Sequence, residues 1–315
     1  MPAAAIEASP TEQTVATLRA GEEVDGLFAC VSSRRQISRA GSPYLTLELR
    51  DRTGAILARA FRDADVLAGR FQEGELVRVR GRVERFRERL QIELVSISSA
   101  AAEEVEERRF LPTSFRDLDE LDGFFEHLAG ELSELPLGAL VEALIGDGEL
   151  RSELRRAPCS VPAARIEGAA ARGRPAHHAY LGGLLEHTVA VATLALEACQ
   201  LHPRLDRDLL LCAALVHDLG KTREFDYGAD ICLSQEGRLL GHVELGLRVI
   251  AEHAPASLNG ERRLALEHCV MLHHGPDGAR GQRFASPESL ALYRLNALDA
   301  DVKGALESGG LGRMR

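Results

Sequence analysis

The chain has 315 residues, of which 45% are hydrophobic and 27% are charged. These values are typical of a globular protein with one or two domains and exclude a disordered or fibrous chain. The net charge of −10 excludes a protein that is basic over its whole surface, but the first hundred residues hold 15 arginines against 14 acidic residues and allow a local basic surface.

The N-terminal segment 1–14 has neither the basic start nor the apolar stretch of a secretory signal, and its composition predicts a disordered tail. The longest apolar run, residues 209–216, is too short to span a bilayer, so we expect no transmembrane helix. None of the six cysteines forms a CxxC pair, which favours reduced, buried thiols. We therefore expect a cytoplasmic protein with no membrane partner.

Residues 24–95 alternate apolar and polar side chains with the period of two that is typical of strands. In YLTLELR (44–50) the leucines take every second position, DRTG (51–54) signals a turn, and AILARAF (55–61) continues the alternation. A short helix is expected over 63–72, followed by strands over 75–83 and 89–97. Five strands with a helix between the third and the fourth predict an OB-fold β-barrel over residues 15–100, similar to the OB-fold nucleic-acid-binding domains.

The expected fourth strand places valines on one face and Arg78, Arg80 and Arg82 on the other. Guanidinium groups at strand spacing could follow the phosphates of a single strand, with nearby aromatic rings stacking on its bases. The candidate rings are Phe28, Tyr44, Phe61 and Phe86. The alternative is a solvated outer face on which acids such as Glu84 and Glu88 offset the arginines.

Residues 100–109, AAAEEVEERR, break the strand pattern and predict a domain boundary. Beyond it, residues 101–172 are expected to form a helical connector. We expect Ser114 to cap a helix that runs to about residue 132 and a second helix over 135–146. The connector shows no catalytic group, and its one histidine, His127, is expected at a partly exposed helix position.

Ten of the eleven histidines lie between His177 and His274, in a context that predicts helices over 182–199, 205–220, 242–254, 263–275 and 286–307. Ser286-Pro287 is expected to start the last helix, and Gly220 and Gly275 to end the helices before them. Each helix then brings one polar element to a common place. In chain order these elements are His187, His217-Asp218, His242, His273-His274, and Asn296 or Asp299. Neutral imidazole and carboxylate are both ligands for divalent cations, so the pattern predicts a metal site.

HDLGK (217–221), with GGLLEHT (182–188) before it and LHHG (272–275) after it, resembles the HD-domain superfamily of metal-dependent phosphohydrolases over residues 173–307. With the OB-like segment, and with HHAYLGGLLEHT (177–188) leading in, the chain is most similar to the YhaM-type 3′–5′ exoribonucleases. The resemblance implies a barrel that holds single-stranded nucleic acid and an all-α HD domain, residues 173–315, that hydrolyses it.

The resemblance also implies the roles of individual residues. His187, His217 and Asp218 would hold a first divalent ion, and Asp218 would bridge to a second ion at His242, His273 and His274. Mn²⁺ is expected, with Fe²⁺, Co²⁺ or Mg²⁺ as alternatives, as one or two ions that activate water for attack on phosphorus. Lys221 would either supply a positive charge to the phosphate or orient Asp218. His178 is expected either to contact the phosphate or to be structural, and Glu186 to be a surface acid.

The chain departs from the family pattern at its last element. The family has a segment of the type A-D-N-L-D-A, whereas this chain has LNALDA (295–300), with Asn296 at the expected aspartate and Asp299 three residues later. The two can share a helix face. We favour Asn296 at the metal with Asp299 beside it, and Asp299 as the ligand is the alternative. The segment 160–175, longer than the pattern predicts, is expected to be a flexible loop near the site entrance.

The leading hypothesis is a metal-dependent phosphodiesterase that degrades single-stranded nucleic acid. The favoured substrate is RNA, degraded from its 3′ end, and DNA is an open alternative. One rival is an HD enzyme acting on nucleotides or cyclic dinucleotides, which would not need the barrel. A second rival is a non-catalytic nucleic-acid-binding module in which Asn296 has disabled the site. The sequence leaves the oligomeric state open.

Overall fold

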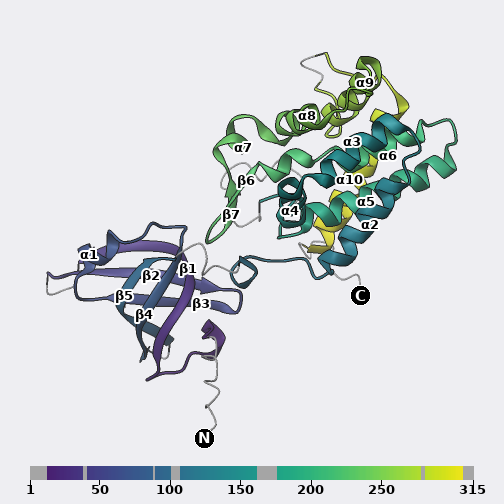
Figure 1. The fold of residues 1–315 in the computed structure, drawn as a ribbon. Helices are drawn as coiled ribbons and strands as arrows, with labels where there is room; N and C mark the ends of the chain where they lie inside the picture. Colours follow the sequence, from purple (N-terminus) through teal and green to yellow (C-terminus); the bar gives the residue numbers. More distant parts are fainter. Residues whose placement is uncertain are drawn as a thin grey trace, which may run out of the picture. The chain divides into compact units, whose positions relative to one another are not determined.

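The computed structural model describes residues 13–37, 41–87, 89–100, 107–161, 176–277 and 281–307. The expected tail, apart from its last two residues, and the expected loop beyond residue 161 lie outside these ranges. The chain divides into two compact units (Figure 1). The first comprises Met1–Leu111 with Tyr227–Asp230, and the second comprises Pro112–Asp226 with Ile231–Arg315.

The first unit is a closed five-stranded barrel with the strand order β1-β2-β3-β5-β4. Strands β3 and β5 pair in parallel, and the other neighbours pair antiparallel. The strands are β1 (Glu23–Ile37), β2 (Pro43–Asp51), β3 (Gly54–Ala60), β4 (Leu76–Phe86) and β5 (Arg89–Ser99). Helix α1 (Ala64–Ala68) lies between β3 and β4, and two 3₁₀ turns flank the barrel at Val15–Thr17 and Glu107–Arg109. The predicted OB-fold is confirmed.

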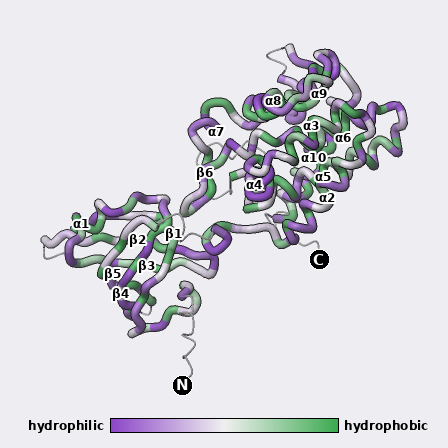
Figure 2. Tube along the Cα trace, in the orientation of Figure 1, coloured by the Kyte–Doolittle hydropathy of each residue, from purple (hydrophilic) through white to green (hydrophobic). Residues whose placement is uncertain are grey.

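The alternating sequence of the strands explains how the barrel fills its interior. Leu45, Leu47 and Leu49 of β2 are buried, and so are the valines of β4, while Arg80 between them is exposed. Successive side chains on a strand point to opposite faces, so the apolar set fills the barrel and the polar set covers it. Figure 2 shows this as alternating colours along the barrel strands.

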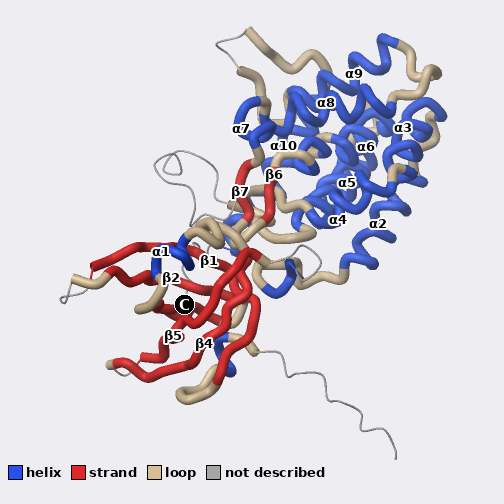
Figure 3. The backbone as a smooth tube through the Cα atoms, turned by 60° about the vertical axis from the view of Figure 1, so that its left-hand side comes forward, coloured by secondary structure: helices blue, strands red, loops and turns tan. Residues whose placement is uncertain are grey.

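The second unit is helical apart from a short hairpin (Figure 3). Its long helices are α2 (Leu118–Gly130), α3 (Leu135–Gly146), α4 (Gly148–Arg156), α5 (Gly183–Leu201), α6 (Arg207–Val216), α8 (Gly241–His253), α9 (Gly260–Met271) and α10 (Pro287–Glu307). A 3₁₀ turn η5 (Leu219–Thr222) follows α6, and the hairpin β6 (Phe225–Tyr227) and β7 (Ile231–Leu233) leads into α7 (Gln235–Leu239). Helices α5, α6 and α10 pack against one another at the centre.

Helix α5 is long and apolar enough to cross a membrane by length and composition alone. The structure shows the alternative reason for that composition, because α5 is a core helix whose residues from Gly183 to Val189 are all buried. Two of these buried residues, Glu186 and His187, are polar and belong to the site described below.

Two local predictions were wrong. Helix α2 begins at Leu118, because the carboxylate of Asp117 accepts the N–H groups of Asp119 and Glu120 at 2.7 and 3.2 Å, while the Ser114 hydroxyl donates to Glu186. Gly220 does not end a helix and lies inside η5. Its lack of a side chain serves packing, since a Cβ there would lie 1.9 Å from the carbonyl oxygen of His242.

Candidate metal centre

The two residues after the apolar run 209–216 are carried into the interior by α6. All eight residues from Leu209 to Val216 are buried, so the helix must end inside the unit. His217 and Asp218 follow at that end and are 0% and 2% exposed. A buried carboxylate needs a compensating charge, and the ammonium group of Lys221, itself buried, lies 2.6 Å from Asp218 Oδ2.

A first group of ligand atoms forms where α5 passes the end of α6. Nε2 of His187 lies 3.2 Å from Nε2 of His217, and the two nitrogens lie 3.6 and 3.4 Å from Asp218 Oδ2. All three side chains are buried, and their ligand atoms lie within 4.8 Å of one another. Two imidazoles and a carboxylate converging on one point form a divalent-cation site.

A second group shares the same aspartate through its other oxygen. Asp218 Oδ1 lies 3.3 Å from Nε2 of His273 and 3.6 Å from Nε2 of His242, which in turn lies 2.8 Å from Nε2 of His274. The ligand atoms of these four residues also lie within 4.8 Å of one another. Because each oxygen of Asp218 faces one group, the carboxylate can bridge two cations, as in two-metal phosphoryl-transfer sites.

The hydrogen bonds behind the histidines fix which ring nitrogen faces the centre. Nδ1 of His217 donates to the carbonyl oxygen of Ala214 at 2.8 Å, and Nδ1 of His273 donates to that of Val270 at 2.5 Å. Nδ1 of His187 donates to Asp299 at 2.6 Å, and Nδ1 of His242 to Glu224 at 3.1 Å. With the proton on Nδ1, the lone pair of each Nε2 points inward, which is the usual arrangement of metal-binding histidines.

Two buried atoms show that the centre fits a cation. Asp218 Oδ1 and His273 Nε2 have no hydrogen-bond partner among the described residues. Leaving a buried carboxylate oxygen and an imidazole lone pair unsatisfied is costly, and a divalent ion between them would satisfy both. The residues present therefore fit a divalent metal.

The protonation states agree with this fit. Burial lowers the pKa of His187 to about 3 and that of His273 to about 4, so both rings are neutral ligands at pH 7. Burial alone would raise the pKa of Asp218, but the ammonium of Lys221 and the nearby His217 hold it well below its usual value. Lys221 thus helps to keep the Asp218 carboxylate ionised and oriented, which favours the second of the two roles predicted for it.

A third group of potential ligands is less suited to metal. Cys159, His177 and His187 bring their ligand atoms within 4.8 Å of one another. However, burial raises the pKa of the Cys159 thiol well above its usual value, and its Sγ lies 3.6 Å from the carbonyl oxygen of Gly183, to which it donates. Because the thiolate is the form that binds metal, we interpret Cys159 as a buried structural thiol rather than a metal ligand.

The structure separates the roles of Asn296 and Asp299, both on α10. Asn296 is buried, and its Nδ2 donates to the carbonyl oxygen of His273 at 3.0 Å. Asp299 Oδ2 accepts from Nδ1 of His187 and lies 3.0 Å from Nε2 of His178. Burial would raise the pKa of Asp299, but these two histidines lower it far below its usual value. Asp299 therefore lies directly behind His187. Whether Asn296 or Asp299 binds an ion stays a prediction.

One polar residue of the site gave no distinct signal in the sequence, and two others are more buried than their predicted roles require. Glu224, which holds His242, is 8% exposed and lies beyond the recognised motif. Glu186, predicted to be a surface acid, is 7% exposed, so that interpretation was wrong. His178 is also buried, with Tyr180 and Asp299 at its ring nitrogens, a placement that supports a positioning role rather than direct contact with nucleic acid.

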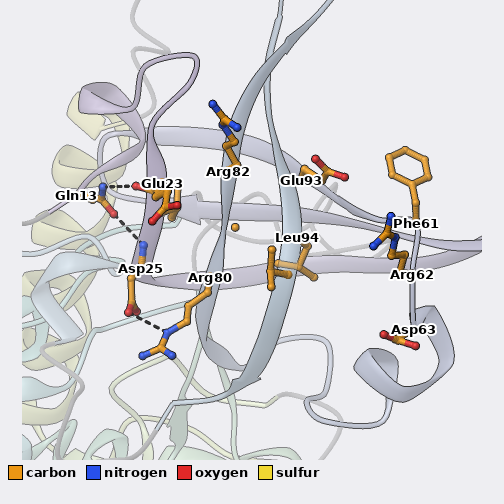
Figure 4. Close-up of a pocket in the computed structure, with 13 residues that line it drawn as sticks. Gln13, Glu23, Asp25, Phe61, Arg62, Asp63, Arg80, Arg82, Glu93 and Leu94 are labelled. Atoms are coloured by element: carbon orange, nitrogen blue, oxygen red, sulfur yellow. Dashed lines mark hydrogen bonds and ion pairs between the residues drawn. The ribbon is translucent and has the colours of Figure 1, made fainter.

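In the first unit, Arg80 and Arg82 of the predicted row line a groove of about 1000 Å³ on the barrel, whereas Arg78 does not (Figure 4). Arg78 and Arg80 both reach the carboxylate of Asp25, at 3.0 and 2.9 Å, and Arg82 lies farther along β4. The charged residues that line the groove are Arg62, Arg80, Arg82, Glu23, Asp25, Asp63 and Glu93. Because the lining has four acidic residues and three arginines, this groove has mixed charge. It should therefore attract the phosphates of a single strand less strongly than the sequence suggested.

The aromatic residues predicted for stacking fall into two classes. Tyr44 and Phe61 stack on each other with ring centroids 5.6 Å apart, and Phe61 is 52% exposed. Phe86 is 46% exposed, with the guanidinium of Arg59 5.3 Å from its ring centre. Phe28, in contrast, is completely buried in the barrel, so its predicted role as a stacking surface was wrong.

Comparison with known proteins agrees with both units. Residues 184–301 match the HD domain family, and residues 28–99 match the OB-fold nucleic acid binding domain family. The chain is 30% identical over 293 residues to the 3′-5′ exoribonuclease YhaM of Shouchella clausii, covering 90% of this chain and 85% of that protein. It is 29% identical over 290 residues to the YhaM of Bacillus subtilis, covering 90% of this chain and 86% of that protein. Among solved structures, a replication protein A domain from Methanococcus maripaludis aligns at 17% identity, covering 28% of this chain and 94% of that chain, with a TM-score of 0.25. The chain belongs to the family of the YhaM 3′-5′ exoribonucleases.

Proposed function

We propose that this protein is a metal-dependent exonuclease that shortens single-stranded RNA from its 3′ end. The observation that carries the proposal is the pair of ligand groups that share Asp218, in a chain that aligns over 90% of its length with relatives named as 3′-5′ exoribonucleases. Phosphodiester hydrolysis needs charge stabilisation at both the attacking and the leaving oxygen, which a bridged pair of cations provides.

The residues of the chain have separate tasks in this proposal. His187 and His217 with Asp218 Oδ2 would hold one ion, and Asp218 Oδ1 with three further histidines the other, namely His242, His273 and His274. When bound, divalent ions polarise the phosphate and activate the attacking water. Lys221 holds Asp218 as a carboxylate, and because its ammonium is buried against that carboxylate it does not reach out to the substrate.

Mn²⁺ is the ion we propose. The donors are mainly imidazole nitrogens with one bridging carboxylate, whereas Mg²⁺ prefers an oxygen-rich octahedral site. Fe²⁺ and Co²⁺ suit the same donors, and Co²⁺ is an arm of the experiment below. A reducing, cytoplasmic location belongs to the proposal, because no disulfide links any of the six cysteines, all of which lie in described residues.

The barrel would hold the RNA strand. Exposed, stackable rings at Phe61 and Phe86 support this role, together with the match to OB-fold nucleic acid binding domains. The presence of this unit favours a polymeric substrate over a free nucleotide or cyclic dinucleotide, which an HD unit could bind without it. The complete set of histidine ligands argues against the non-catalytic alternative.

The test uses one single-stranded RNA labelled at either end, and the matching DNA, with Mn²⁺, Co²⁺, Mg²⁺ or a chelator. A 3′–5′ exonuclease releases labelled mononucleotide at once from the 3′-labelled strand and gives a descending ladder from the 5′-labelled strand. The His217→Ala variant is the inactive control, and His127→Ala, at an exposed position of α2, is the matched active one. Absence of metal-dependent release from either strand, or internal cuts without a ladder, contradicts the proposal.

A further inference from the structure

The chain uses lysine at only two positions, although it has 38 basic residues. Lys221 lies beside the bridging carboxylate of Asp218, as described above. Lys303, on α10, has its Nζ 2.7 Å from Oε1 of Glu186 and 5.6 Å from the ring centre of Tyr180. Both lysines therefore pair with a carboxylate that is itself less than a tenth exposed. An ammonium is compact and donates in three directions, whereas the planar guanidinium fork needs more room.

Glu186, near the start of α5, contacts three other segments of the chain through Ser114, Tyr180 and Lys303. Its Oε2 accepts the hydroxyl of Tyr180 at 3.0 Å and that of Ser114 at 2.8 Å, while Oε1 receives Lys303. Burial would raise the pKa of Glu186, but the bonds from Lys303 and Ser114 lower it below its usual value, so Glu186 is a buried carboxylate with its acceptor sites used. A buried charge satisfied in this way is held in one orientation.

From Tyr180 the hydrogen bonds continue to the metal centre. The Tyr180 hydroxyl lies 3.0 Å from Nδ1 of His178, whose Nε2 lies 3.0 Å from Asp299 Oδ2. The same oxygen accepts Nδ1 of His187, and Nε2 of His187 belongs to the first ligand group. The chain of contacts therefore runs from Lys303 through Glu186, Tyr180, His178 and Asp299 to His187.

The backbone conformation of His178 shows that this series of hydrogen bonds is held under constraint. His178 has a φ of 46°, in the left-handed region that non-glycine residues seldom adopt. Its N–H donates to Oε2 of Glu307 at 3.1 Å. Asp299, Lys303 and Glu307 follow one another at intervals of four on α10 and so share one face. The last two turns of α10 thus clamp the His178 segment from one side.

We propose that Lys303, Glu186 and Tyr180 are positioning residues of the metal centre, which fix His178 and Asp299 and thereby the orientation of His187. This inference rests on the proposed function, because it concerns the same metal site. None of the three residues touches the ligand atoms of the first group, so they act through His178 and Asp299. Replacing a residue that orients a metal-binding histidine typically lowers metal affinity by about 10- to 100-fold.

The test measures Mn²⁺ affinity of the full-length protein by calorimetry, with the thermal midpoint of the metal-free protein as a folding control. Tyr180→Phe and Lys303→Met are expected to weaken Mn²⁺ binding by about 10-fold, the lower end of that range, because both act through His178 and Asp299. The metal-free midpoint should stay near that of the wild type in Tyr180→Phe, whereas Lys303→Met should lower it because Glu186 loses its cation. Lys303→Arg is expected to weaken Mn²⁺ binding as well, because the planar guanidinium fork is larger than the ammonium and donates in other directions. Tyr293→Phe, also on α10 but with its ring centre 5.6 Å from that of Phe284, is the matched control and should bind as the wild type does.

Wild-type Mn²⁺ affinity in both Tyr180→Phe and Lys303→Met overturns the inference. The same holds if the loss of affinity in both variants is matched by an equal loss in Tyr293→Phe. A wild-type protein that binds Mn²⁺ but cleaves no RNA would contradict the proposed function alone. The two ideas can therefore fail separately.

Discussion

Gly220→Ala should damage the metal centre without replacing a ligand. Gly220 lies in η5, two residues after Asp218, and packs against the start of α8, where His242 lies. A Cβ at Gly220 would be 1.9 Å from the His242 carbonyl oxygen and 2.4 Å from the Gly246 nitrogen, whereas real Cβ contacts are essentially never below 3.0 Å. The obstacles are backbone atoms of a helix, which cannot rotate away as the end of a side chain can.

The displacement follows from these distances. Helix α8 and η5 must separate by about 1 Å, and metal-site geometry tolerates about 0.5 Å. Overpacking a well-packed interior costs about 1–3 kcal/mol, and we expect the upper end because the clash is between backbones. At about 2–4 °C per kcal/mol for a unit of this size, the thermal midpoint should fall by about 6–12 °C.

The assay compares thermal unfolding and Mn²⁺ titration of Gly220→Ala with those of Gly138→Ala. Gly138 lies within α3 with nothing within 4 Å of a built Cβ, so alanine there should raise stability slightly, by about 0.5–1 kcal/mol. The reasoning is refuted if Gly220→Ala melts within about 2 °C of the wild type, a shift that corresponds to under about 1 kcal/mol.

Four further predictions concern the ligands and the barrel. His217→Ala or Asp218→Ala should abolish RNA hydrolysis with unchanged helical circular dichroism, and more than about a tenth of wild-type activity in either would contradict the metal assignment. Phe61→Ala should weaken RNA binding by about 1–3 kcal/mol without changing its salt dependence, as measured by fluorescence anisotropy at several salt concentrations. Replacing Arg78, Arg80 and Arg82 together should lower the slope of log K against log salt by at most about 2, and an unchanged slope would make them a solvated face. Asp299→Ala should weaken Mn²⁺ binding by about 10- to 100-fold, whereas equal affinity in a titration would exclude it from the site.

The barrel and the helical order were predictable because their signals are local. Alternation in β2 and β4 follows from the pleat, and the apolar run of α6 follows from its burial on all sides. Residues 217–218 were recognised because an acid and an imidazole after a buried helix need compensation. Glu224 and Tyr180 could not be found this way, since their roles depend on partners, His242 and His178, that only the tertiary fold defines.

The choice between Asn296 and Asp299 shows where sequence reasoning stops. A spacing of three puts both on one side of α10, so periodicity cannot separate them. Packing does, because the Asn296 amide must donate to the His273 carbonyl, a bond that a carboxylate would replace with repulsion between two acceptors. Asn296→Asp should therefore lower the thermal midpoint and leave Mn²⁺ affinity no tighter than in the wild type, contrary to the effect expected of a missing ligand charge. Tighter binding in this variant would place residue 296 at the ion and assign Asp299 to the support of His187 alone.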